Sequence, residues 1–263
     1  MPDLLRSLLS ICNVLLLSVG LLACSVNPER EEQGGELGAA ESTLALSHAA
    51  DRLLVTPPSA VNWQPFALPG KRHVAFEPVF VLEREALRVK ADNSVSILRR
   101  RFEPILIKPG RLNFSWKVDA LPAGAELADG EASDSPVGIV LGFEGDRGRW
   151  SPRMHRLSEV SRLLTGEELP YATLMYVWGN REALGTVVVN PRTDRIRKLV
   201  LDSGTQKTGV WRDHERDVRA DFRLAFGEEP GPLRVVALMT DTDNTQSRLT
   251  AWYGPLTLSS MTD

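Results

Sequence analysis

The sequence predicts a mainly β protein, an antiparallel two-sheet jelly-roll sandwich with one or two short helices. Three observations support this prediction. Short apolar or alternating runs recur along most of the chain, turn residues separate these runs, and only two later segments have helical spacing. Many short strands with few helices bury their apolar faces most simply when one sheet packs on another.

The expected strands begin near residue 87. Leu112–Val118 alternates apolar and polar residues and is the clearest strand in the chain. The polar and acidic stretch 122–136 is expected to be a loop. Further strands are expected over residues 87–91, 95–98, 137–143, 173–178, 185–189, 196–200, 232–239 and 251–258.

Two segments interrupt the β pattern and are expected to be helical. The first is Met154–Leu164, which Thr165 and Gly166 follow. The second is Asp213–Phe226, in which Asp213 can cap the helix and Gly227 can end it. Its apolar residues share one face of a helix; they are Val218, Phe222, Ala225 and Phe226.

The N-terminus predicts an exported protein that is held to a membrane by lipid. An apolar stretch ends in Leu21-Leu22-Ala23-Cys24, and a small residue directly before a cysteine is typical of a bacterial lipoprotein signal. An uncleaved N-terminal anchor is the alternative. We expect residues 1–23 to be the signal peptide, Cys24 to carry the lipid, 24–50 to be a flexible tether and 51–263 to form a single β-sandwich domain. Ser25 favours the outer membrane of the cell envelope over the inner one.

Cysteine content and charge exclude several classes of site. Cys12 lies in the predicted signal and Cys24 would be lipidated, so the mature chain would have no thiol for a disulfide or a cysteine nucleophile. The formal net charge is −3, and nothing in the chain has the basic character of a nucleic-acid-binding protein.

The densest group of oxygen ligands is Thr240-Asp241-Thr242-Asp243-Asn244-Thr245, directly after an apolar strand. Asp241 and Asp243 would face the same side of an extended chain, and Asn244 could add a carbonyl oxygen. Hard cations such as Ca²⁺ take ligands of this kind. A turn rich in Asp and Asn between two strands explains the same residues without a metal.

No sequence motif identifies a catalytic centre. Asp202-Ser203-Gly204-Thr205 resembles the carboxylate turn of an aspartic protease, but that chemistry needs two such carboxylates and the sequence contains one such turn. The four histidines have no metal-ligand spacing, and no nucleophile elbow, P-loop or dinucleotide fingerprint occurs. Catalysis by carboxylates of the loops stays open, but the sequence does not indicate which two of them would form a catalytic pair.

Six tryptophans occur beside three tyrosines. Trp211 lies in a polar loop with charged neighbours, as in surfaces that stack sugar rings, and Trp178 is a second candidate for ligand binding. Core packing is the simpler explanation for each single tryptophan, because large aromatic side chains are buried on average.

An ordered set of short motifs resembles a bacterial family of exported proteins of unknown function. The set covers about residues 63–258, and the resemblance implies one jelly-roll domain akin to carbohydrate-binding modules, with no established activity. The motifs include Phe114–Val118, Tyr176–Gly179, Gly209–Trp211, Glu215–Val218, Phe226–Glu228, Met239–Thr245 and Ala251–Gly254.

These observations favour a lipid-anchored envelope module that binds a glycan or another envelope component without catalysis. Trp211, Trp178, Asp241, Asp243 and Asn244 are its candidate ligand-binding residues, and the last three are candidate Ca²⁺ ligands. Two alternatives stay open. One is an enzyme that acts on a polysaccharide or ester through loop carboxylates, and the other is a structural or assembly lipoprotein that binds a protein partner.

Overall fold

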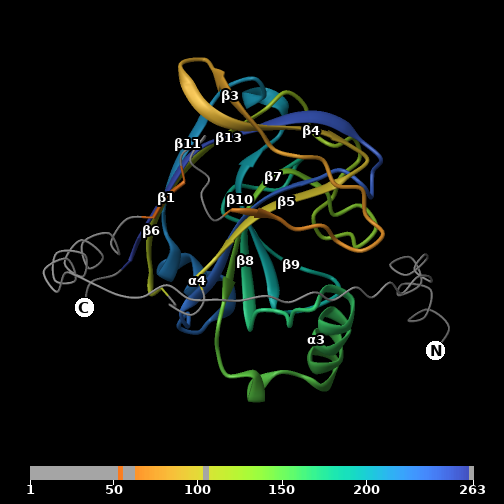
Figure 1. The fold of residues 1–263 in the computed structure, drawn as a ribbon, viewed down its shortest axis with the longest axis vertical. Coiled ribbons are helices and arrows are strands. Elements are labelled where there is room, and N and C mark those ends of the chain that lie inside the picture. Colours follow the sequence, from red (N-terminus) through yellow and green to blue (C-terminus); the bar gives the residue numbers. More distant parts are fainter. Residues whose placement is uncertain (1–52, 56–62, 103–106, 261–263) are drawn as a thin grey trace, which may run out of the picture.

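The computed structural model describes residues 53–55, 63–102 and 107–260. Figure 1 shows that strands of two sheets make up most of this region, with one helix, α3 (Pro152–Thr165), at the lower edge of the view. The predicted signal peptide, the lipidation site Cys24 and the tether lie outside the described residues. No helix in the described ranges is long and apolar enough to cross a membrane.

Sheet A has β13 at its centre. The spatial order is β11 (Arg212–Asp217), β6 (Pro109–Val118), β13 (Arg248–Ser260), β4 (Arg84–Asp92) and β3 (Glu77–Val81), and β1 (Leu53–Val55) also pairs with β13. All of these strand pairs are antiparallel.

Sheet B has β12 and β7 near its centre. The order is β2 (Gln64–Pro65), β5 (Val95–Arg101), β12 (Leu233–Asp241), β7 (Ser135–Phe143), β8 (Ala172–Gly179), β10 (Ile196–Ser203) and β9 (Val187–Val189). One pair of neighbours, β8 and β10, is parallel. An otherwise antiparallel sheet therefore carries one parallel pair close to its edge.

The connections between the sheets confirm the predicted jelly roll. The chain passes from β4 to β5, from β6 to β7 and from β12 to β13, and each step crosses from one sheet to the other. In sheet A β13 lies between β4 and β6, while in sheet B β12 lies between β5 and β7. Pairs of strands that wrap together over two sheets define the jelly-roll arrangement.

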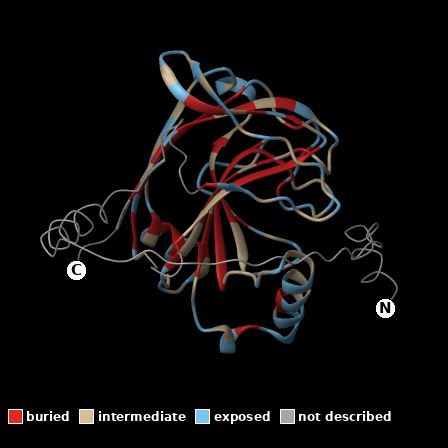
Figure 2. Cartoon of the chain, viewed as in Figure 1, coloured by how far each residue is buried: buried red, intermediate tan, exposed pale blue. Residues whose placement is uncertain are grey.

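The core lies between the two sheets, where residues from both inner faces meet (Figure 2). In β6 the inward residues are apolar and the outward ones are mostly polar, as the sequence alternation predicts. Trp116, Tyr176, Trp178 and Tyr253 are among the largest fully buried side chains.

The outer faces of the two sheets differ. Phe66 and Leu68 pack on β5 and β12 in sheet B, and Leu127 and Val188 pack on β8 and β10. The outer face of sheet B is therefore largely covered by other parts of the chain. Among the described residues, the outer face of sheet A carries polar side chains and a depression.

Both predicted helices exist, but one begins later than expected. Helix α3 is capped by Ser151 and ends at Gly166, which has φ of 77°. The second helix, α4 (Val218–Phe226), is capped by Asp217, not by Asp213. Residues 212–217 instead pair with β6 as strand β11, because pairing along a sheet edge outweighs weak helical periodicity in a polar segment. The 3₁₀ helices η1 (Arg147–Arg149) and η2 (Thr205–Lys207) complete the structure.

Candidate functional site

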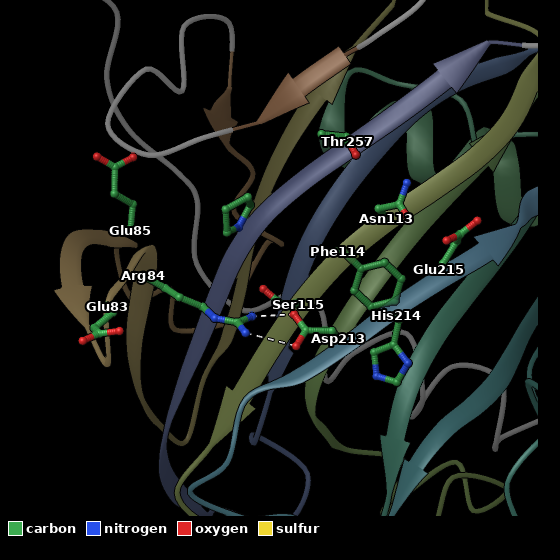
Figure 3. A pocket seen from close by; sticks show the side chains of 11 residues that line it. Glu83, Arg84, Glu85, Asn113, Phe114, Ser115, Asp213, His214, Glu215 and Thr257 are labelled. Carbon is green, nitrogen blue, oxygen red and sulfur yellow. Dashed lines mark hydrogen bonds and ion pairs between the residues drawn. The ribbon is translucent and has the colours of Figure 1, made fainter.

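A groove of about 680 Å³ lies on the outer face of sheet A (Figure 3). Its floor includes polar side chains of β6 and β13, namely Asn113, Ser115 and Thr257. The tip of the β3–β4 hairpin forms one side, and β11 forms the other. Leu82 and Glu83 turn this hairpin with positive φ angles of 49° and 60°.

Arg84 and Asp213 join the two sides of the groove. Both terminal nitrogens of Arg84 donate to the carboxylate of Asp213, and the Nη2–Oδ2 distance is 3.1 Å. The Arg84 guanidinium lowers the pKa of Asp213, although partial burial opposes this shift. The pair fixes the hairpin tip over the sheet.

Trp211 directly precedes β11 and lies beside Arg84, a residue that lines the groove. The residue is partly exposed, and the Arg84 guanidinium carbon lies 5.2 Å from the ring centroid. A Cβ atom on Gly254 would lie only 3.4 Å from the ring, so the absence of a side chain there lets the ring approach the sheet. Trp211 therefore packs between the Arg84 guanidinium and the backbone of Gly254, and its predicted role in stacking a sugar stays a prediction.

Trp178 has a different environment. Its side chain is fully buried in the core, and its indole nitrogen donates to the carbonyl of Gly204 at 3.1 Å. The prediction of Trp178 as a ligand-binding residue is wrong, because its position on β8 turns the ring toward the opposite sheet rather than toward solvent.

A cluster of carboxylates lies at the end of sheet B. Asp134, Asp241 and Asp243 each offer an oxygen atom, and these atoms lie within 4.8 Å of one another. Asp241 Oδ1 is buried and has no hydrogen-bond partner among the described residues. Burial raises the pKa of Asp241 well above its usual range, and the charges of Asp134 and Asp243 raise it further.

Asp134 also orders the turn that carries the other two acids. Its oxygens accept hydrogen bonds from the backbone nitrogens of Asn244 and Thr245, and from the Thr245 hydroxyl at 2.6 Å. The Asn244 side chain donates to the Gly130 carbonyl at 3.1 Å. The Asn244 side chain therefore holds the turn against the acidic loop. Asn244 lies next to the carboxylate cluster, for which it was predicted to supply a ligand.

Two lysines lie beside the carboxylates. Lys71 forms an ion pair with Asp243. Lys198 is 5% exposed and donates to the Ser133 carbonyl at 2.7 Å. Burial lowers the pKa of Lys198, while the charges of Asp241 and Asp134 oppose this shift. A cation at this cluster would compete with these ammonium groups.

Asp202, from the protease-like turn, lies in a buried polar cluster. Its carboxylate accepts from the Trp116 indole at 2.7 Å, from Arg212 Nε at 2.8 Å, and its Oδ2 lies 2.8 Å from His214 Nε2. Burial alone would raise the pKa of Asp202, but the hydrogen bonds from His214, Trp116 and Arg212 lower it. This carboxylate fastens β10 to β6 and β11, which fits a structural role.

Sequence reasoning missed Arg84, Asn113 and Asp134. Arg84 stands beside two glutamates at a hairpin turn, and Asn113 is one polar residue of an alternating strand. Asp134 lies at the end of the acidic loop, directly before the buried strand β7, and that position was its only signal. Each belongs to the site through contacts that span more than a hundred residues of sequence.

A family model described as a protein of unknown function (DUF3047) matches residues 61–257. No curated protein matches the chain. Among solved structures, a mutant of the carbohydrate-binding module CBM29-2 is 9% identical, with a TM-score of 0.33, and the match covers 80% of this chain and 92% of that one.

Two further structures have comparable scores. A module specific for non-crystalline cellulose, CBM28, is 11% identical, with a TM-score of 0.31 and coverage of 76% of this chain and 84% of that one. The xyloglucanase domain of NopAA from Sinorhizobium fredii, solved with cellobiose, is 9% identical, with a TM-score of 0.34 and coverage of 80% and 99%.

Proposed function

The chain belongs to the DUF3047 family, whose function is unknown, and from the geometry of its open sheet we propose that it is a non-catalytic module that binds a glycan in the groove of sheet A. The observation that carries this proposal is the groove itself. It lies on the open face of the sandwich, its floor offers polar side chains, and the partly exposed Trp211 lies beside Arg84 at its edge.

These groups match the chemistry of a sugar. An aromatic ring packs against the apolar face of a pyranose, while amides, hydroxyls and charged groups bond to its hydroxyls. Asn113 is exposed on β6, and Thr257 faces the same groove from β13. The ion pair of Arg84 with Asp213 holds these groups in a fixed arrangement, which lowers the entropy lost on binding.

Glycan titration of the full-length chain in detergent tests this proposal. Trp211→Ala and Asn113→Ala should each weaken binding at least about tenfold, which corresponds to 1.4 kcal/mol. Leu163→Ala is the matched control, because Leu163 is 81% exposed on α3, outside the groove. Unchanged affinity in both variants, with the fold intact by circular dichroism, would show that the groove is not the glycan-binding site. Release of reducing ends would identify an enzyme instead.

We also propose that Cys24 anchors the module in the cell envelope, in the outer membrane. The small residue before Cys24 and the apolar stretch before it support this assignment. Cys24→Ser should move the protein from the membrane fraction to the soluble fraction and abolish labelling by a fatty-acid probe. Retention of Cys24→Ser in the membrane fraction, with no fatty-acid labelling of the wild type, would point to an uncleaved anchor.

The carboxylate cluster is the proposed site for a divalent cation such as Ca²⁺. Its support is the approach of Asp134, Asp241 and Asp243 and the unpaired, buried oxygen of Asp241. Binding would displace Lys71 from Asp243. At about 100 times its Kd, Ca²⁺ should add roughly 2.7 kcal/mol to the free energy of unfolding, relative to EDTA. Asp241→Asn should remove this gain, and an unchanged melting temperature in wild type would rule out a stabilising site.

A further inference from the structure

We infer that the groove of sheet A selects glycans by charge: it favours polymers with free amino groups over neutral ones, and it rejects uronates and phosphorylated sugars. This inference rests on the proposed glycan binding and names the class of glycan. It comes from the charge of the residues around the groove. These residues are mostly acidic, whereas the whole chain has nearly equal numbers of acidic and basic residues.

The lining of the groove is acidic. Four of its residues are carboxylates and one is an arginine, which leaves a formal charge of −3 when His214 is counted as neutral. The carboxylates lie on both sides: Glu83 and Glu85 on the hairpin, and Asp213 and Glu215 on β11 (Figure 3). Acidic residues therefore lie along both edges of the groove, and Arg84 is the hairpin side chain that points across it toward Asp213.

The positive groups nearby are already neutralised. Both terminal nitrogens of Arg84 donate hydrogen bonds to the Asp213 carboxylate, so the charge of Arg84 is balanced within the groove. Arg111, outside the lining, forms an ion pair with Glu215. Glu83 is exposed and has no ion-pair partner in the part of the chain that the structure describes. Even with Arg111 included, the charge around the groove stays negative.

The shape of the site strengthens this effect. A depression lined by one sign of charge focuses the electric field and raises the local concentration of opposite charge. An ammonium group on a sugar ring could pair with Glu83 or take the place of Arg111 at Glu215, whereas a carboxylate or phosphate in the same place would be repelled by Glu83. Because these side chains are exposed, each such pair should change affinity about two- to five-fold, and less at high salt.

Three polymers of matched length test the inference on the full-length chain: chitosan, its N-acetylated form and a polyuronate. We expect chitosan to bind most tightly, the acetylated polymer less tightly and the polyuronate least, with a chitosan preference that shrinks between 50 and 500 mM salt. The combined variant Glu83→Gln and Glu215→Gln should reduce the preference of chitosan over its acetylated form at least about fourfold. The control variant Glu126→Gln and Glu159→Gln removes two exposed carboxylates elsewhere and should leave the preference unchanged.

The outcomes separate the inference from the proposed function. Equal binding of all three polymers, or tightest binding of the polyuronate, would overturn charge selection and leave glycan binding intact. Binding of none of the polymers or of a wider glycan panel would overturn the proposed function itself. If oligolysine displaced chitosan at equal charge concentration, and Trp211→Ala did not affect chitosan binding, the groove would be a polycation surface and not a sugar site.

Discussion

Arg84 and Asp213 form a two-point ion pair, although two strands, β13 and β6, lie between the strands that carry them. In a flat sheet β4 and β11 would be about 14 Å apart, at about 4.8 Å per strand spacing. Arg84 lies beyond the last paired residues of β4 and β13, Leu87 and Tyr253, and its side chain extends from the hairpin to Asp213 (Figure 3). This contact bounds the groove and connects its two sides.

The first prediction concerns this ion pair. Arg84→Gln should change the free energy of unfolding by no more than about 1 kcal/mol, because the pair is exposed. Hydrogen exchange in residues 77–88 should nevertheless become faster, since the hairpin loses its contact with β11. Arg88→Gln is the control, because Arg88 pairs with Glu77 within the hairpin itself. Equal exchange in Arg84→Gln and wild type would show that the ion pair does not hold the hairpin.

Asp202 should be among the most sensitive positions of the core. Asp202→Ala leaves the Trp116 indole, Arg212 and His214 without their shared acceptor, and should lower the free energy of unfolding by about 3 kcal/mol in urea. Asp194→Ala, at an exposed position, should have little effect. A loss below 1 kcal/mol in Asp202→Ala would contradict the fastening role.

The same carboxylate gives a pH dependence with a definite sign. The pKa of Asp202 is lower in the folded protein than in the unfolded chain, where it is about 3.9. The contribution of Asp202 to the free energy of unfolding is therefore complete above the unfolded pKa and is lost as pH falls through the folded pKa. Acid unfolding of wild type should therefore be steeper below pH 4 than that of Asp202→Ala.

Asp241 should show the opposite dependence. Its pKa is raised by burial and by the charges of Asp134 and Asp243, so the folded state holds this proton more tightly than the unfolded chain does. In EDTA, stability should fall as pH rises from about 4 toward the folded pKa. Asp241→Asn should flatten this slope in thermal melts, and a slope equal to that of wild type would mean that the cluster is already neutralised by Lys71 and Lys198.

Gly254 offers a test of the Trp211 position. A Cβ at residue 254 would lie 2.1 Å from Ser115 Oγ and 3.4 Å from the Trp211 ring, so Gly254→Ala should shift both side chains. We expect altered tryptophan emission and weaker glycan binding, with a stability change below about 2 kcal/mol. The control is Gly138→Ala, where the nearest atom would be 3.5 Å away. Identical emission and affinity in Gly254→Ala would separate Trp211 from the site.

Local patterns in the sequence predicted much of the fold but less of the site. Alternation in Leu112–Val118 and the helical spacing of Met154–Leu164 are local patterns, and the structure has a strand and a helix over these residues. Strand β11 was predicted as helix because its sheet pairing with β6 is a long-range interaction. Trp178 was assigned to a ligand because the sequence does not show which face of β8 meets the other sheet.

The candidate site depends on long-range contacts to a greater extent than the individual strands and helices do. Asp241 and Asp243 are neighbours in sequence and could be found by inspection, whereas Asp134 reaches them only through the pairing of β7 with β12. The groove likewise needs a hairpin near residue 83 and a strand near residue 213 on one face. A single sequence contains no local signal for contacts between segments so far apart in the chain.

The central place of β13 in sheet A determines when the protein can fold. This last strand lies between β4 and β6, and its residues 251–253 pair with both neighbours. During synthesis from the N-terminus, β4 with β3 forms one part of sheet A and β6 with β11 forms another, and these two parts stay apart until residues 248–260 arrive to pair with both. Removal of β13 would take out the centre of the sheet rather than trim an edge, so the two sides of the groove come together only after β13 has been made.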